Sequence, residues 1–181
     1  MKFRNKIKRF SDDSFGGLSV EAVMIIPLLL WAFLGLFVLF DSFHAKATNV
    51  KASAMIGDLL SRETNEINAA YMDGLNDVLD FLTHSPHDTI MRVSVVRYDG
   101  AEDEHILVWS HATAGKEMIT EGTLSTIVPH IPVVQDAGSV IVVETWMAYV
   151  PFLNIAIEPL WFQNTVVTSP RFAPQLKWES A

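Results

Sequence analysis

The chain has 181 residues, no cysteine and a formal net charge of −8, and hydrophobic residues make up 50% of it. The lack of cysteine excludes disulfide scaffolds, thiol catalysis and cysteine metal centres. The acidic balance makes nucleic acid a poor candidate partner, because an acidic surface repels phosphate backbones.

The N-terminal region joins a short basic leader to a long apolar run. The leader contains five basic residues, namely Lys2, Arg4, Lys6, Lys8 and Arg9. The run extends from Ala22 to Phe40, has 19 residues and carries no charge. At about 1.5 Å per residue, such a helix is close to the roughly 30 Å hydrocarbon thickness of a bilayer. Because basic flanks stay cytoplasmic, we expect the N-terminus inside the cell and residues 41–181 outside the membrane.

The junction before the apolar run places small residues close to an acidic one. Gly16 and Gly17 are followed by Glu21, at the first turn of the expected membrane helix. A small residue at a scissile position lets the backbone lie extended in a protease cleft. A carboxylate at a helix start complements the positive end of the helix dipole. The order of parts favours an exported precursor whose leader is removed, whereas spacing alone is equally compatible with Glu21 as a simple helix-start residue.

Two ordinary explanations compete for the same region. One is a cleaved secretory signal, for which Ala45-Lys46-Ala47 offers an A-x-A-like site. Against it, the apolar run exceeds the 7–15 residues of a signal peptide core, and a lysine lies within the site. The other explanation is an uncleaved signal anchor, which composition alone leaves open.

Residues 41–84 predict an amphipathic helix that continues from the membrane segment, because apolar residues recur at helical spacing. A first stripe contains Phe43, Ala47, Val50 and Ala54, and a second contains Ile56, Leu60, Ile67, Tyr71, Leu75, Val78 and Leu82. Gly57 and Gly74 each weaken the helix by roughly 1 kcal/mol relative to alanine, which is compatible with a break near either. Ser85-Pro86 ends the helical pattern.

Residues 85–181 change to the period-two pattern of strands. The expected strands cover residues 90–98, 106–112, 139–152 and 162–168, with Asp99-Gly100 as the turn after the first. Residues 113–137 are expected to be a connection with a short helix over 116–128. A helix followed by an antiparallel sheet predicts an α+β fold.

The sequence offers little support for catalysis or metal binding. His84 and His87 are three residues apart, but no third ligand stands at a recognised spacing. The chain contains no G-x-S-x-G, G-x-G-x-x-G or P-loop motif. We therefore expect a protein that is not an enzyme and has no metal site or cofactor.

Three motifs together resemble the TadE/TadG-like minor pseudopilins of the tight-adherence (Flp) pilus system. The first motif is Phe15-Gly16 followed, after four residues, by Glu21, and it is similar to the prepilin cleavage site. One difference is Gly17, which stands where major pilins often carry phenylalanine. Residues 143–151 resemble the family's valine–glutamate … tyrosine–x–proline strand. Residues 166–172 resemble its closing strand and Pro-Arg ending. The motifs stand in the family's order between residues 15 and 172.

The resemblance implies a pilin-like fold in four parts: a cytoplasmic leader (1–16), a transmembrane helix (17–40), an amphipathic helix (41–84) and a sheet domain (85–181). A membrane prepilin peptidase would cut after Gly16, leave Gly17 as the new N-terminus and make Glu21 the fifth mature residue. The remaining chain has eight basic and 19 acidic residues, a net charge of −11.

The same resemblance implies a role in pilus assembly, adhesion, biofilm formation and secretion from the bacterial inner membrane. The implied partners are the prepilin peptidase, other pilins and pseudopilins, inner-membrane platform proteins and membrane lipid, with the sheet domain in the periplasm. The alternative is an uncleaved single-pass protein that serves as an envelope-anchored binding module or scaffold.

Overall fold

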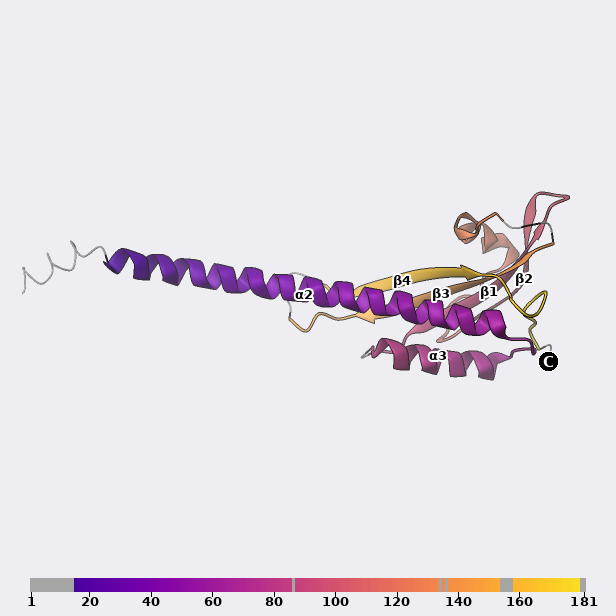
Figure 1. Ribbon diagram of the computed structural model, residues 1–181, viewed down its shortest axis with the longest axis horizontal. Helices are drawn as coiled ribbons and strands as arrows, with labels where there is room; N and C mark the ends of the chain where they lie inside the picture. The colour runs from indigo at the N-terminus through magenta and orange to yellow at the C-terminus, as the bar shows by residue number, and fades with distance from the viewer. Residues whose placement is uncertain (1–14, 86, 134, 136, 154–157, 180–181) are drawn as a thin grey trace, which may run out of the picture.

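The molecule is built on helix α2, which runs for 48 residues from Phe15 to Arg62. The computed structural model describes residues 15–85, 87–133, 135, 137–153 and 158–179. The N-terminal half of α2 projects beyond the rest of the chain, and its C-terminal half lies along a β-sheet (Figure 1). Pro27 lies inside the helix without ending it. In the described part of the chain, α2 is the one helix long and apolar enough to cross a membrane.

The helical pattern after the membrane segment is divided into two helices, and the break lies at neither glycine. Gly57 is inside α2, whereas Gly74 is inside the second helix, α3 (Ala69–Thr83). The intervening turn is organised by Glu63, whose carboxylate accepts hydrogen bonds from the amides of Asn65 (3.1 Å) and Thr64 (3.0 Å). These bonds, led by that of Asn65, lower the pKa of Glu63 below its usual 4.5 despite partial burial.

Helix α3 has side-chain and backbone signals at both ends. The Asn68 side chain accepts a hydrogen bond from the Tyr71 amide at the N-terminus, which satisfies one of the free amides of the first turn. At the other end His84 adopts the left-handed conformation, and its amide donates to the Asp80 carbonyl. The helix therefore ends at Thr83 with His84 as its C-cap, directly before Ser85-Pro86, where the sequence predicts its end.

The sheet has four antiparallel strands in the order β2-β1-β3-β4. The strands are β1 (Ile90–Asp99), β2 (Glu104–Ala112), β3 (Ser139–Tyr149) and β4 (Leu160–Thr168). All four strands predicted from the sequence are present, with shifted ends, and the α+β class is confirmed. The third strand ends at Tyr149 rather than residue 152, just before Pro151, which has no amide to donate to a neighbouring strand.

Both faces of the sheet are covered, which the sequence pattern did not indicate. Helices α2 and α3 bury one face, and the 3-10 turns η1 (Glu121–Thr126) and η2 (Val128–His130) lie against the other. On that second face, Ile119, Leu124 and Ile127 pack with Val140 and Val142. The segment expected to be a connection is thus part of the core, and the helix expected over 116–128 is replaced by these two short turns.

The face that α2 turns to the sheet differs from the first predicted stripe. Phe43, Ala47, Val50 and Ala54 are exposed, whereas the buried positions are Asn49, Ala52, Ser53, Ile56, Leu60 and Ser61. Small and polar residues occupy this interface because the helix lies close to the sheet. A Cβ atom added at Gly57 would lie 3.2 Å from Val166 Cγ1. The second stripe is largely correct, since Ile56, Leu60, Ile67 and Leu75 are buried, but Val78 is 39% exposed.

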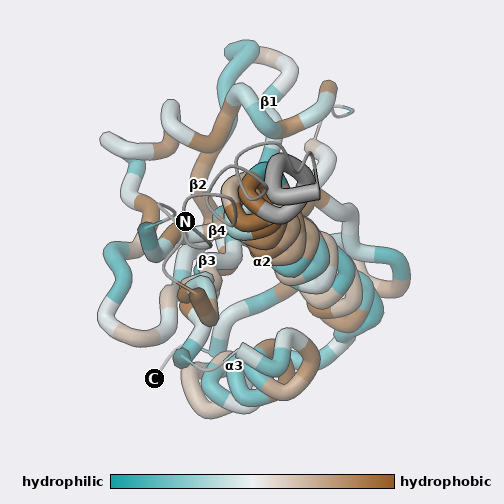
Figure 2. Tube along the Cα trace, turned by 90° about the vertical axis from the view of Figure 1, so that its left-hand side faces the viewer, coloured by the Kyte–Doolittle hydropathy of each residue, from teal (hydrophilic) through white to brown (hydrophobic). Residues whose placement is uncertain are grey.

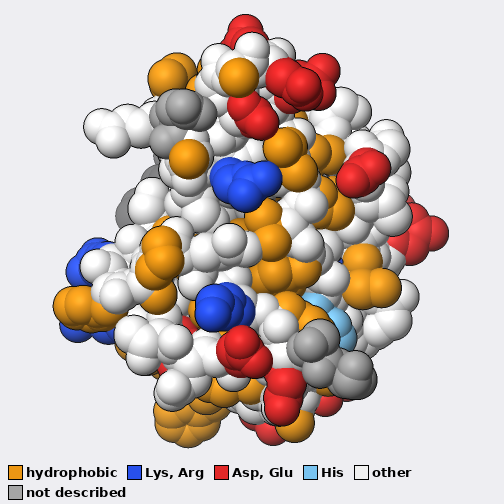
Figure 3. All heavy atoms as spheres, turned by 90° about the vertical axis from the view of Figure 1, so that its right-hand side faces the viewer, with side chains coloured by type: hydrophobic (Ala, Val, Ile, Leu, Met, Phe, Trp, Pro, Cys, Tyr) orange, Lys and Arg blue, Asp and Glu red, His pale blue; other side chains and the backbone are white. Residues whose placement is uncertain are grey.

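Residues after β4 close the end of the molecule remote from the projecting helix. The Arg171 amide donates to the Ser61 carbonyl at 2.7 Å, and its guanidinium lies 3.2 Å from Asp58. The Trp109 indole donates to the Leu176 carbonyl at 2.9 Å. Acidic side chains lie around much of the edge of this end (Figure 3). The Pro-Arg motif therefore fastens the last turn of α2.

Candidate functional site

The three residues predicted to form the processing site all lie in α2. Gly16 and Gly17 follow its first residue, and Glu21 stands little more than one turn further along, with an exposed side chain. Residues 1–14 of the predicted leader (1–16) lie outside the described residues.

The projecting half of α2 presents apolar side chains in every direction. Met24 is 75% exposed and Phe40 is 72% exposed. Other large exposed side chains here are Val20, Val23, Ile26, Leu28, Leu29, Leu30, Trp31, Phe33, Leu36 and Phe37. Soluble monomers rarely expose contiguous apolar patches larger than a few hundred Å². An apolar helix that is exposed on all sides is typical of a segment surrounded by lipid or by other helices.

One apolar stripe continues beyond the charge-free run on the face of α2 that points away from the sheet. It consists of Phe40, Phe43, Ala47, Val50 and Ala54, which we call the outer stripe. Their spacing of three or four residues places them on one side of a helix. Figure 2 looks along α2 from its N-terminal side and places β3 and β4 to one side of the helix, with α3 below it. The outer stripe is left without a partner in the described chain.

The opposite face of α2 is joined to the sheet by a buried polar network. The Ser53 and Thr145 hydroxyls lie 2.7 Å apart, and Thr145 also donates to Asn49 Oδ1 at 3.3 Å. The side-chain Nδ2 of Asn49 donates to the Phe162 carbonyl at 3.4 Å. Asn49, Ser53 and Thr145 are all at most 1% exposed. Because each buried polar group needs its partner, the network fixes the register of the helix on β3 and β4.

The glutamate of the β3 motif forms a buried ion pair on the other face of the sheet. Arg92 Nη2 lies 2.6 Å from Glu144 Oε2, with side-chain exposures of 12% and 4%. The Arg92 guanidinium also lies 5.2 Å from the ring centre of Trp146, and the Lys116 ammonium lies 4.5 Å from that ring. Glu144 therefore neutralises a cation inside the fold and is not presented to a substrate.

The tyrosine of the same motif holds α2 at the end of the charge-free run. The Tyr149 hydroxyl lies 2.9 Å from Asp41 Oδ2 and 3.2 Å from the Val38 carbonyl oxygen, two acceptors that share its proton. Burial, followed by the hydrogen bond and the charge of Asp41, raises the pKa of Tyr149 to about 12. The neutral hydroxyl therefore persists at all physiological pH values.

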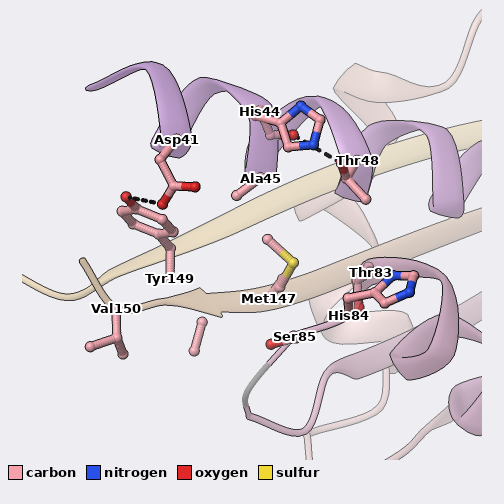
Figure 4. A pocket seen from close by; sticks show the side chains of 11 residues that line it. Asp41, His44, Ala45, Thr48, Thr83, His84, Ser85, Met147, Tyr149 and Val150 are labelled. Carbon is pink, nitrogen blue, oxygen red and sulfur yellow. Dashed lines mark hydrogen bonds between the residues drawn. The ribbon is translucent and has the colours of Figure 1, made fainter. Parts of the chain in front are cut away.

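A pocket of about 490 Å³ lies beside this contact, between α2, the end of α3 and the end of β3. Its lining includes His44 from α2, His84 directly after α3, and Met147 and Tyr149 from β3 (Figure 4). The described residues contain no group of three or more histidine, cysteine, aspartate or glutamate side chains that would hold a metal ion. The residues that line the pocket come from both α2 and β3, so the pocket lies at the junction between these two elements.

The strand that carries the motif was predicted correctly from the sequence, whereas the exposure of the outer stripe and the polar network were not predicted. The processing residues Gly16, Gly17 and Glu21 stay predictions. The spacing of the stripe was recognised and assigned to the wrong face. A signal for the correct face was present, since a helix that packs closely on a sheet favours the small residues Ala52, Ser53 and Gly57. In comparisons with known proteins, no family model, curated protein or solved structure matches the chain.

Proposed function

We propose that the protein is a minor pseudopilin of a tight-adherence (Flp, type IV-like) pilus and acts in pilus assembly. A prepilin peptidase removes the leader after Gly16, and the protein then works by bundling its membrane helix with those of other subunits. The proposal combines the three-motif resemblance with the arrangement of α2. It assigns the chain no catalytic role.

The observation that carries the proposal is the division of α2 into two halves with different surroundings. One half is packed on the sheet through Asn49, Ser53, Ile56 and Leu60, while the other is apolar and projects free of the domain. The outer stripe extends the apolar surface of the projecting half alongside the domain. A partner helix that packs in the membrane therefore has a continuous apolar seam along which to continue outside it.

Glu21 has a defined place in this proposal. Its side chain is exposed on the projecting half of α2, close to the position that cleavage after Gly16 would make the new N-terminus. Glu21 directly precedes the charge-free run, and a shifted register that carried its unpaired carboxylate toward the bilayer centre would cost up to roughly 2.5–3.5 kcal/mol. That cost is absent in the register where the carboxylate meets the α-amino group of a neighbouring subunit, so Glu21 selects the register of the bundle.

The outer stripe provides the test of assembly. A photo-crosslinking residue at Ala47 is expected to join the protein to other pilins or to its own copies in cells that produce the pilus machinery. The matched control is the same residue at Phe81, which is 74% exposed but lies on α3. Replacing both Phe43 and Val50 with glutamate is expected to abolish the Ala47 adduct and leave far-ultraviolet circular dichroism unchanged.

The opposite result would remove the support for an assembly role. If Ala47 and Phe81 give the same weak adducts while the chain is inserted in the membrane, the outer stripe is not a subunit contact. An envelope-anchored binding or scaffold module would then be the better description.

A further inference from the structure

The described residues that directly follow β3 lie against α2 near the end of its charge-free run (Figure 1). The rings of Phe152 and Phe37 meet edge to face, with centroids 5.5 Å apart. The Tyr149 hydroxyl lies 3.2 Å from the Val38 carbonyl oxygen. Two independent contacts therefore place this end of the sheet domain beside residues 37 and 38 of the helix.

The position of these contacts along α2 sets their depth relative to a bilayer. Phe37 precedes Phe40, the last residue of the charge-free run, by three residues, or about 4.5 Å along the helix axis. Asp41, the first charged residue after the run, marks where the helix returns to a polar environment. If residues 22–40 fill the hydrocarbon core, Phe152 reaches the edge of that core from the side of the sheet domain.

The surface at this end has the composition of a membrane interface. Val150 is 45% exposed, Phe152 55%, Leu160 44% and Trp161 59%. Tyrosine and tryptophan concentrate at the level of lipid headgroups, where an apolar ring and a polar group are both accommodated. Glu158 is also exposed, and its charge limits insertion to the interface.

We propose that this end of the sheet domain is an interfacial lipid-binding surface, in which Val150, Phe152, Leu160 and Trp161 insert into the leaflet next to α2. Lipid reaches these side chains only if α2 crosses a bilayer, so the proposal rests on that part of the proposed function. The sheet domain then contacts the membrane surface and keeps one orientation relative to it. Because α2 is fixed to the sheet through Tyr149 and the polar network, this membrane contact also fixes the direction in which the outer stripe points.

Fluorescence quenching by lipid tests the surface directly, and the cysteine-free sequence allows single labels. The full chain is reconstituted into phosphatidylcholine vesicles with or without lipid that carries a nitroxide high on its acyl chain. Bimane is attached to Phe152→Cys or Trp161→Cys. The matched control is Phe172→Cys, which is 69% exposed but lies after β4 near the remote end. Phe33→Cys, inside the charge-free run, reports whether α2 is in the bilayer.

The labels at 152 and 161 are expected to lose most of their emission to nitroxide lipid, whereas the label at 172 retains its emission. Circular dichroism of each variant verifies that the chain is folded. Two positions are labelled so that the test still holds if one of the two substitutions disrupts the fold. Quenching at 33 without quenching at 152 and 161 would overturn the surface while leaving the membrane helix intact. A lack of quenching at 33 would overturn both the surface and the proposed membrane role. Quenching by iodide in the aqueous phase is measured on the same labels. If neither nitroxide lipid nor iodide quenches the labels at 152 and 161, protein covers the surface, and the proposal is overturned.

Discussion

Removing either partner of the Arg92–Glu144 pair is expected to destabilise the fold strongly, although both residues lie on the face of the sheet that α2 does not cover. The changes are Arg92→Met and Glu144→Leu, alone and combined. The carboxylate is 4% exposed and the guanidinium 12% exposed, so either group left alone is a largely buried, uncompensated charge. Arg92 also donates to the Glu117 carbonyl at 2.9 Å, a bond too weak to replace the carboxylate.

The expected magnitude follows from burial. Breaking a buried ion pair by removing one partner costs about 3–5 kcal/mol, whereas replacing both partners with apolar residues of similar volume is close to neutral. The double variant also loses the contact between Arg92 and the Trp146 ring, worth about 0.5–1 kcal/mol. We therefore expect each single variant to lose about 3–5 kcal/mol and the double variant only about 1–2 kcal/mol.

Urea denaturation of the full chain in detergent micelles measures these differences, with circular dichroism and tryptophan fluorescence as two probes. Arg62→Met is the control, because the Arg62–Asp58 pair is 54% and 42% exposed and is expected to contribute about 0.3–0.5 kcal/mol. A double variant that loses the sum of the two single losses would refute the coupling. Single variants no less stable than Arg62→Met would refute the buried-charge argument itself.

Four further variants test the helices and their contacts. Thermal unfolding measures the first two. Gly57→Leu should destabilise the fold by about 1–3 kcal/mol, because its Cβ would lie close to Val166. Gly74→Ala should stabilise the fold by about 0.5–1 kcal/mol, because an added Cβ would meet no neighbouring atom within 4 Å. The lowered pKa of Glu63 gives stability that is present above pH 4.5 and lost as pH falls, so acid titration of Glu63→Gln should show a smaller loss. The raised pKa of Tyr149 gives stability that is present below pH 10.0 and lost as pH rises toward about 12, and Tyr149→Phe should lack this alkaline loss. Equal acid or alkaline profiles for a variant and its parent would contradict the corresponding contact.

The strands were predictable because their signal is local. Alternating β-branched residues and flanking turn residues specify β1 and β3, whatever lies next to them. The end of α3 was similarly marked by Ser85-Pro86. These features depend on a few neighbouring residues, so they are read correctly without the tertiary structure.

The packing of α2 was not predictable by the same reasoning. Its outer stripe has the periodicity of a core face, and the true core face contains Asn49 and Ser53, which resemble surface residues until Thr145 is placed opposite them. The break at residues 63–68 also had no glycine signal, because it is stabilised by Glu63 accepting amides that become free only after the helix ends. Both features depend on contacts between elements. The processing residues Gly16, Gly17 and Glu21 remain predictions from sequence.

The intact mass of the protein isolated from membranes tests the central claim most directly. It should be measured with and without the prepilin peptidase, and for Glu21→Ala alongside the parent chain. We expect a mass that begins at Gly17 and returns to full length without the peptidase. A full-length mass in every case would contradict it and leave an uncleaved envelope-anchored module. A chain that begins at Thr48 would contradict it differently, by showing an ordinary secretory signal.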